Sequence, residues 1–178
     1  MGIIIALGSN YEPEDNLRRA VERLVIQVRV LAASRVYETA ALDEDGQPIP
    51  RQGPYLNAAL LVDTDLTPTR LKYDVLRPIE AALGRVRFGT MPTAMVTIDL
   101  DLALYGDQII EQNDPPLVLP DPNILTRAYV ALPLADLVPE VLHPVTGEAL
   151  ATIAARFATT PGLTIRDDIH LFSGGTDA

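Results

Sequence analysis

The sequence contains no cysteine and few basic residues, and each shortage excludes a class of protein. Without cysteine the chain has neither a disulfide framework nor a thiolate metal site. Its 14 basic residues stand against 24 acidic ones, which gives a formal net charge of −10. Such a chain repels a nucleic-acid backbone, so we predict no nucleic-acid partner. An anionic ligand would have to be met by local arginines or by a metal ion.

Long hydrophobic runs are also absent. The apolar run at residues 3–7 is too short to span a membrane and lacks the basic start of a signal peptide. This favours a cytoplasmic protein without membrane association. The length of 178 residues and the hydrophobic content of 48% fit one globular domain, which we place at residues 1–172. We expect residues 173–178 to be a disordered tail.

The stretch at residues 97–106 alternates apolar and acidic side chains as a β-strand does. Asp99 and Asp101 would share one face of this strand. Two adjacent carboxylates repel each other unless a cation lies between them, and Mg²⁺ takes one or two carboxylates together with phosphate oxygens. The pair therefore indicates magnesium-dependent phosphate chemistry; the alternative is the solvated face of an amphipathic strand. We expect the opposite, apolar face to consist of Ile98, Leu100, Leu102 and Leu104.

Hydrophobic periodicity predicts two helices and four strands in the first two thirds of the chain. Apolar or alternating segments predict strands at residues 3–7, 34–39, 55–62 and 97–106. Helical spacing predicts a helix that starts at Pro13 and a second one between Thr67 and Gly84. We expect Pro78 to kink or break the second helix, because proline lacks the amide proton that an interior helical position donates.

The resulting order, β-α-β-β-α-β, is that of the ferredoxin-like α+β fold. In this fold an antiparallel sheet carries helices on one face, and here a C-terminal extension would follow. The open face of the sheet would then gather an aromatic side chain, an amide and the carboxylate pair. These residues are Tyr55, Asn57, Asp99 and Asp101.

The remaining segments are loops and the C-terminal extension. Residues 43–53 are rich in charges and turn formers, and they form either a long hairpin connection or a lid. Prolines favour an extended path over residues 115–134, and a further helix is expected near residues 148–157. His143 and His170 lack a ligand-like spacing, and we interpret both as incidental.

Six ordered segments carry a family resemblance over about residues 3–145. They are Ala6 to Asn10, Ser34 to Thr39, Pro54 to Ala59, Ile79-Glu80 with Gly84 to Arg87, Ile98 to Asp101 and Arg127 to Leu134. Together they resemble the 6-hydroxymethyl-7,8-dihydropterin pyrophosphokinases of folate biosynthesis. The resemblance implies transfer of pyrophosphate from ATP to 6-hydroxymethyl-7,8-dihydropterin, with release of AMP and with two Mg²⁺ ions as cofactors. It implies ATP and a dihydropterin as partners; we expect a monomer or a homodimer.

The resemblance also implies roles for individual residues. As catalytic groups it implies Arg85 with Asp99 and Asp101, and the two aspartates would also bind the metal. The pterin would be bound by Thr39, Leu42, Tyr55, Asn57 and Tyr129, and the nucleotide by Glu80, Arg87 and Arg127.

The sequence departs from the family pattern on the nucleotide side. Residues 91–97 contain neither the arginines nor the tryptophan of the family loop, and Val96 stands in place of its second arginine. Asp121 occupies a position where the family commonly has histidine. Three interpretations remain: an enzyme completed by another group such as Arg51, a weak or inactive relative that binds a pterin-like ligand or a protein partner, and a plain interaction module.

Overall fold

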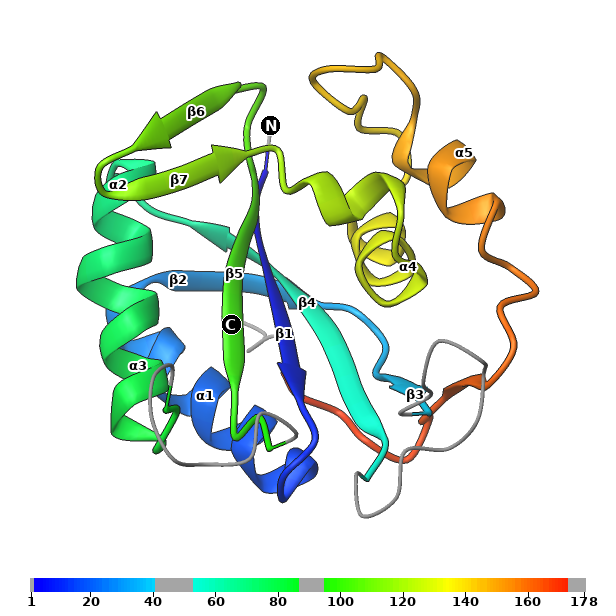
Figure 1. Cartoon of the computed structure of the whole chain (residues 1–178), viewed down its shortest axis with the longest axis horizontal. Helices are drawn as coiled ribbons and strands as arrows, with labels where there is room; N and C mark the ends of the chain where they lie inside the picture. The colour runs from blue at the N-terminus through cyan, green and yellow to red at the C-terminus, as the bar shows by residue number, and fades with distance from the viewer. Residues whose placement is uncertain (1, 41–52, 87–94, 173–178) are drawn as a thin grey trace, which may run out of the picture.

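The computed structural model describes residues 2–40, 53–86 and 95–172 of the chain, and Figure 1 shows their arrangement. A six-stranded sheet has the order β5-β1-β4-β3-β8, with β2 also pairing with β4, and β6 and β7 form a separate hairpin. Every strand pairing is antiparallel. The strands are β1 (Ile3–Ser9), β2 (Arg29–Ala33), β3 (Tyr37–Thr39), β4 (Tyr55–Asp63), β5 (Asp99–Tyr105), β6 (Ile110–Asn113), β7 (Pro116–Leu119) and β8 (Leu163–Ile165).

The predicted βαββαβ core is confirmed, with one strand more than expected. Of the segment predicted as a strand at residues 34–39, only residues 37–39 form one, β3, and β2 ends just before the segment, at Ala33. Both strands pair with β4. The chain leaves the ladder at Ser34, where the Ser34 hydroxyl accepts a hydrogen bond from Ala59 N at 2.8 Å. Ser34 N in turn donates to Ala59 O at 2.9 Å, and regular pairing with β4 resumes only at Tyr37.

The two core helices cover one face of the sheet (Figure 1). Helix α1 (Pro13–Gln27) buries Leu17 and Leu24 completely. The second helix is continuous but irregular: α2 (Pro68–Arg70) leads into a π-helical turn, η1 (Leu71–Leu76), and then into α3 (Arg77–Ala82).

The ends of the second helix agree with the sequence prediction. The Thr67 side chain accepts a hydrogen bond from Arg70 N as an N-cap, and Gly84 ends the helix with a φ of 82°. The π-helical turn ends at Leu76, two residues before Pro78, whose ring cannot fit against a regular α-helical turn. We expected a kink or a break at Pro78; the helix is instead continuous, and its irregularity is a widened turn.

The C-terminal extension packs on the opposite face of the sheet. After the short 3₁₀ turn η2 (Pro122–Leu125), helices α4 (Ala128–Leu137) and α5 (Leu150–Ala155) cover part of this face. The prediction of an extended path through residue 134 is therefore wrong at residues 122–125 and from residue 128 onward. Burial of Val130, Ala131 and Leu134 against the sheet offsets the hydrogen bond that Pro133 cannot donate inside α4. The helix expected near residues 148–157 is confirmed as α5.

A β-bulge corrects the predicted face of Leu104. Ile4 pairs with Leu104 and Ile5 with Leu102, so the register of β5 against β1 shifts between these positions. Leu100 and Leu102 lie in the core on the face that the two helices cover, as predicted, whereas Leu104 packs with Ile4 in the core that includes α4. The bulge leaves Asp99 and Asp101 together on the face that carries α4.

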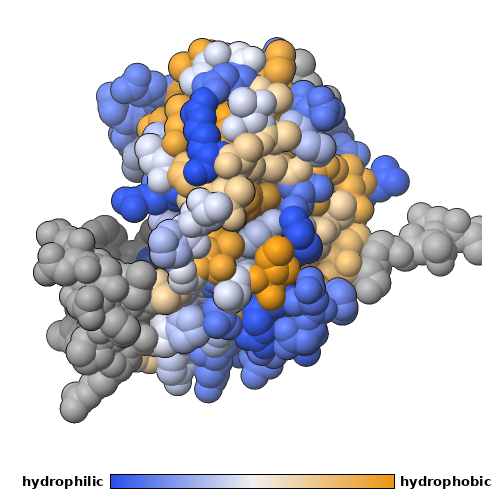
Figure 2. All heavy atoms as spheres, turned by 90° about the vertical axis from the view of Figure 1, so that its right-hand side faces the viewer, coloured by the Kyte–Doolittle hydropathy of each residue, from blue (hydrophilic) through white to orange (hydrophobic). Residues whose placement is uncertain are grey.

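The outer surface of the C-terminal extension is mixed. Figure 2 views the side that lies on the right in Figure 1, and hydrophobic residues alternate there with hydrophilic ones. In the described part of the chain, none of the helices is long and apolar enough to cross a bilayer.

Candidate active site

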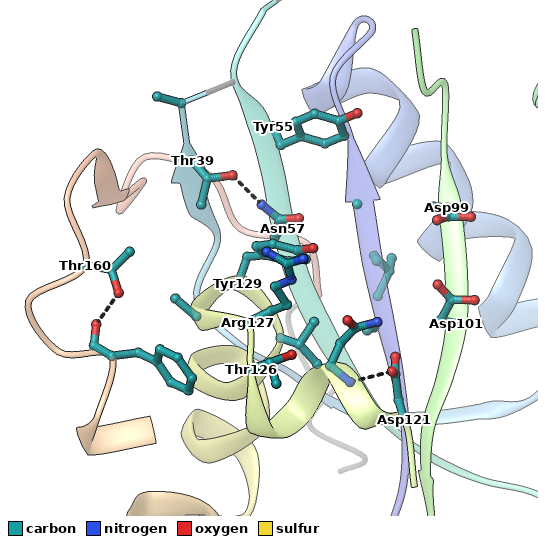
Figure 3. A pocket seen from close by; sticks show the side chains of 18 of the residues that line it. Thr39, Tyr55, Asn57, Asp99, Asp101, Asp121, Thr126, Arg127, Tyr129 and Thr160 are labelled. Atoms are coloured by element: carbon teal, nitrogen blue, oxygen red, sulfur yellow. Dashed lines mark hydrogen bonds between the residues drawn. The ribbon is translucent and has the colours of Figure 1, made fainter. Parts of the chain in front are cut away.

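A cavity of about 730 Å³ lies on the face of the sheet that α4 covers only in part. Strands β1, β3, β4 and β5 form its floor, and the start of α4 and the segment after α5 form its walls (Figure 3). The predicted site residues that line it are Thr39, Tyr55, Asn57, Asp99, Asp101, Arg127 and Tyr129.

The floor of the cavity is open because β1 carries small residues there. Gly8 pairs with Asn57 on one side and with Asp99 on the other. A Cβ atom at Gly8 would lie 3.2 Å from Asn57 Oδ1, closer than normal packing allows. Glycine at this position therefore keeps the surface between the amide and the carboxylates clear.

An aromatic and polar set occupies one end of the cavity. Asn57 is almost fully buried and donates a hydrogen bond from Nδ2 to Thr39 Oγ1 at 3.1 Å. Tyr55 of β4 and Tyr129 of α4 lie near this pair, and Arg127 projects beside Tyr129 (Figure 3). Aromatic rings beside a fixed amide suit a flat heterocycle that stacks and forms hydrogen bonds at its edge.

The carboxylate pair occupies the other end. Asp99 and Asp101 project from β5 on the same side of the sheet (Figure 3). Burial raises the pKa of Asp101 to about 6, and the nearby carboxylates of Asp99 and Asp121 act in the same direction. Burial likewise raises the pKa of Asp121. This end of the cavity thus holds an excess of negative charge that a bound cation would stabilise.

The donors present fit a divalent ion that also binds substrate. Among the described residues no group of three His, Cys, Asp or Glu side chains could hold a metal ion. An ion at Asp99 and Asp101 therefore has to complete its coordination with water or with oxygens of a ligand. Mg²⁺ in phosphoryl-transfer sites is bound in this way, through one or two carboxylates and the phosphates.

Two arginines, one in α3 and one just after it, approach the carboxylates. Arg77 Nη2 lies 3.8 Å from Asp101 Oδ1, and Arg85 Nε lies 3.9 Å from Asp99 Oδ1. Arg85 Nε is buried and has no hydrogen-bond partner within the described ranges. The predicted catalytic residue Arg85 is thus close to the acidic pair, although it does not line the cavity.

The other predicted residues have different positions. Glu80 does not line the cavity; it is buried beside β5, where its Oε1 accepts a hydrogen bond from Leu100 N at 2.8 Å. Burial raises the pKa of Glu80 to about 7, although the Leu100 amide and Arg77 oppose this shift. Leu42, Arg87 and Arg51, like most of the loop at 43–53, lie outside the described residues.

A second cavity of about 240 Å³ adjoins the first and shares Asp101, Asp121 and Asn123 with it. Lys72 and strand β7 line it on the side away from the aspartates' strand β5. Burial lowers the pKa of the Lys72 ammonium group. Sequence reasoning missed Lys72, although the chain has no other lysine.

The walls of the first cavity include further residues that the sequence analysis did not identify. The segment after α5 contributes several of them, and it is joined to β3 by β8 and by a hydrogen bond from Ala40 N to Gly162 O at 3.1 Å. No local motif marks these residues, because a pairing between distant segments brings them to the cavity. They are Asn123, Thr126, Phe157, Thr160, Pro161 and Gly162.

Comparison with known proteins agrees with this architecture. Residues 4–139 match the family described as 7,8-dihydro-6-hydroxymethylpterin-pyrophosphokinase (HPPK). The 2-amino-4-hydroxy-6-hydroxymethyldihydropteridine pyrophosphokinase of Pseudomonas aeruginosa is 36% identical over 146 residues, which are 80% of this chain and 83% of that protein. The enzyme of the same name from Methylorubrum extorquens is 38% identical over 141 residues, 78% of this chain and 83% of that one.

A longer relative and a solved structure extend the comparison. The folic acid synthesis protein fol1 of Pneumocystis carinii is 35% identical over 152 residues, which are 84% of this chain but only 19% of that protein. The crystal structure of Plasmodium falciparum HPPK-DHPS wild type with pteroate has a TM-score of 0.63 at 12% identity and covers 88% of this chain and 42% of that one, which shows the shared fold. Taken with the family match, these similarities show that the chain belongs to the HPPK family of pyrophosphokinases.

Proposed function

We propose that the chain transfers pyrophosphate from ATP to 6-hydroxymethyl-7,8-dihydropterin and releases AMP, as its family membership supports. The observation that carries the proposal is the composition of one cavity, which holds the aromatic and amide set at one end and the carboxylate pair at the other. A bicyclic pterin is flat and polar along one edge, so it suits the first end. Its hydroxymethyl group would then be directed toward the second.

The pterin would lie between Tyr55 and Tyr129, with its polar edge against Asn57 and Thr39. The hydrogen bond between these two side chains fixes the amide orientation before the ligand arrives. Such preorganisation reduces the entropy lost on binding and holds the hydroxymethyl oxygen for attack.

Asp99 and Asp101 would hold Mg²⁺, which neutralises charge on the polyphosphate when bound. Arg85 and Arg127 would assist from opposite sides, Arg85 beside Asp99 and Arg127 on the cavity wall. In phosphoryl transfer the protein itself forms few or no covalent bonds with the substrate. Positioning and electrostatic stabilisation therefore account for most of the catalysis.

The nucleotide would extend from the carboxylate pair into the second cavity. Asp101 and Asp121 border both cavities, so a chain of phosphates that passes Asp101 enters the smaller one directly. Glu80 would support β5 by accepting the hydrogen bond from Leu100 N. Arg87 would bind the nucleotide. We also propose a cytoplasmic location and a monomer or homodimer.

A steady-state assay tests this proposal. Purified protein is supplied with MgATP and 6-hydroxymethyl-7,8-dihydropterin, and AMP is measured. We expect AMP formation by the wild type and none by the Asp99→Asn/Asp101→Asn double variant. The matched control is Asp63→Asn/Asp65→Asn, because this pair has the same spacing but is exposed and lines neither cavity. Equal loss in both double variants would contradict the assignment.

A second candidate is pterin binding without catalysis. It is favoured by the absence of any lysine or arginine between Arg87 and Arg127 in the sequence, since phosphoryl transfer usually relies on cations around the phosphates. In that case calorimetry would detect pterin binding by the wild type, while the assay would detect no AMP.

A further inference from the structure

Lys72 is the only lysine of the chain, and it lies in the π-helical turn η1. Its side chain lines the second cavity together with Asp101 and Asp121. A widened helical turn changes the direction of the side chains it carries, and such turns are frequent at functional sites. Lys72 therefore lies at a candidate functional position, and neither pterin binding nor the carboxylate pair uses it.

The contacts of Lys72 hold its ammonium group at the cavity wall. Nζ donates a hydrogen bond to Pro116 O at 3.1 Å and lies 5.7 Å from the centre of the Tyr73 ring. The Tyr73 hydroxyl donates to the same carbonyl at 2.6 Å, which ties the helix to the start of β7. An ammonium group has three donors, so two remain for a ligand.

The neighbouring cations are engaged elsewhere. Arg77 Nη1 bonds both carboxylate oxygens of Glu80, at 2.9 and 2.7 Å; its Nη2 lies 3.8 Å from Asp101, but Arg77 itself lines neither cavity. Arg85 lies beside Asp99 and also lines neither. Of the basic side chains within the described ranges, only Lys72 lines the second cavity. An anionic group that enters there would meet two carboxylates and one ammonium.

We propose that Lys72 binds a phosphate oxygen of the nucleotide in the second cavity. The assignment rests on the proposed function, since it takes the nucleotide to be ATP. A cation at this point offsets the repulsion that Asp101 and Asp121 exert on the phosphates, and a charge-assisted hydrogen bond adds directly to affinity. Lys72 thus supplies part of the positive charge that the chain lacks between residues 87 and 127.

Direct binding of the Mg²⁺ complex of a non-hydrolysable ATP analogue tests the proposal. We expect Lys72→Met to weaken this binding about tenfold or more, the loss expected for one charge-assisted hydrogen bond, while pterin binding is unchanged. Lys72→Arg should retain most of the nucleotide affinity. The matched control is Arg70→Met, because Arg70 belongs to the same helix but is exposed, forms a surface ion pair with Asp74 and lines neither cavity.

The outcomes separate the two proposals. If the wild type binds both ligands and Lys72→Met binds the nucleotide analogue as tightly as Arg70→Met does, the Lys72 assignment is wrong and the proposed function stands. If the wild type binds neither pterin nor nucleotide, the proposed function is wrong and the Lys72 assignment is wrong with it. Circular dichroism of each variant checks that a loss of binding is not a loss of fold.

A second readout follows from the single lysine. Reductive methylation with ¹³C-formaldehyde labels only Lys72 and the terminal amine, and the dimethylated ammonium keeps its charge and one donor. We expect the Lys72 signal to shift when the magnesium–nucleotide complex is added and to stay in place when pterin alone is added. An unchanged Lys72 signal at saturating nucleotide overturns the assignment.

Discussion

Glu80 Oε1 accepts a hydrogen bond from Leu100 N at 2.8 Å, and Leu100 separates the two aspartates of the candidate active site. Because β5 is the last strand in the order of the described sheet, its outer backbone groups need a partner other than a strand. The carboxylate provides one, and Arg77 in turn compensates its charge at 2.7 Å. A helix thereby fixes the strand that carries Asp99 and Asp101.

Loss of the Glu80 carboxylate should destabilise the fold. Glu80→Ala leaves Leu100 N without its acceptor and leaves Arg77 only the longer contact with Asp101, so we expect the free energy of unfolding to fall by about 3 kcal/mol. Urea denaturation measures the change. The control is Asp74→Ala, which breaks the exposed ion pair with Arg70 and should cost less than about 1 kcal/mol. Similar losses in the two variants would contradict this role of Glu80.

A methyl group at position 8 should impair pterin binding. In Gly8→Ala the new Cβ would press on Asn57 Oδ1 from 3.2 Å and disturb the hydrogen bond between Asn57 and Thr39. We expect calorimetry to show about tenfold weaker binding of the pterin, the loss of roughly one hydrogen bond. Gly53→Ala serves as the control, since a Cβ there meets its nearest atom only at 3.6 Å. Unchanged pterin affinity in Gly8→Ala would show that the floor tolerates a side chain.

Metal binding should weaken in acid. Since the pKa of Asp101 is raised to about 6, a proton competes with the ion below that pH. One competing proton lowers the apparent affinity by up to about tenfold for each pH unit. Titration with Mn²⁺, followed by the electron paramagnetic resonance of the free ion at pH 5, 6 and 7, measures this dependence. A constant affinity across the three values would exclude Asp101 as a ligand.

Acid should also reduce stability through His143. This side chain is buried, and its Nδ1 accepts weak hydrogen bonds from Val145 N and Thr146 N, at 3.4 and 3.3 Å. Burial lowers the pKa of His143, while Glu148 opposes the shift. Below a pH of about 6.5 the unfolded chain therefore binds a proton that the folded chain resists, and the free energy of unfolding falls with the pH.

The comparison of variants isolates this contribution. Urea unfolding at pH 7 and pH 5 should show a smaller loss of stability for His143→Gln than for the wild type. His170→Gln is the control and should behave as the wild type does, because His170 is exposed. If all three proteins lose the same stability between these pH values, His143 does not titrate as its burial requires.

Much of the fold followed from local patterns in the sequence. Alternation along β4 placed Tyr55 and Asn57 on one face and Leu56, Ala58 and Leu60 on the other, and the packing agrees. The spacing of apolar residues located α1, and Thr67 and Gly84 marked the ends of the second helix. These features depend on residues close together in the chain, so they can be predicted without knowledge of the tertiary structure.

The sequence by itself determined the strand alternation, the order of the core elements and the adjacency of Asp99 and Asp101, because a side chain's face on a strand is set by its immediate neighbours. Only the tertiary structure decided the rest. Pairing of β5 with β1 created the bulge that turns Leu104 to the other core. Packing between distant segments placed Glu80 against the backbone of Leu100, between the two aspartates, and placed Lys72 at the second cavity. Such contacts join residues far apart in the chain, and no local periodicity encodes them.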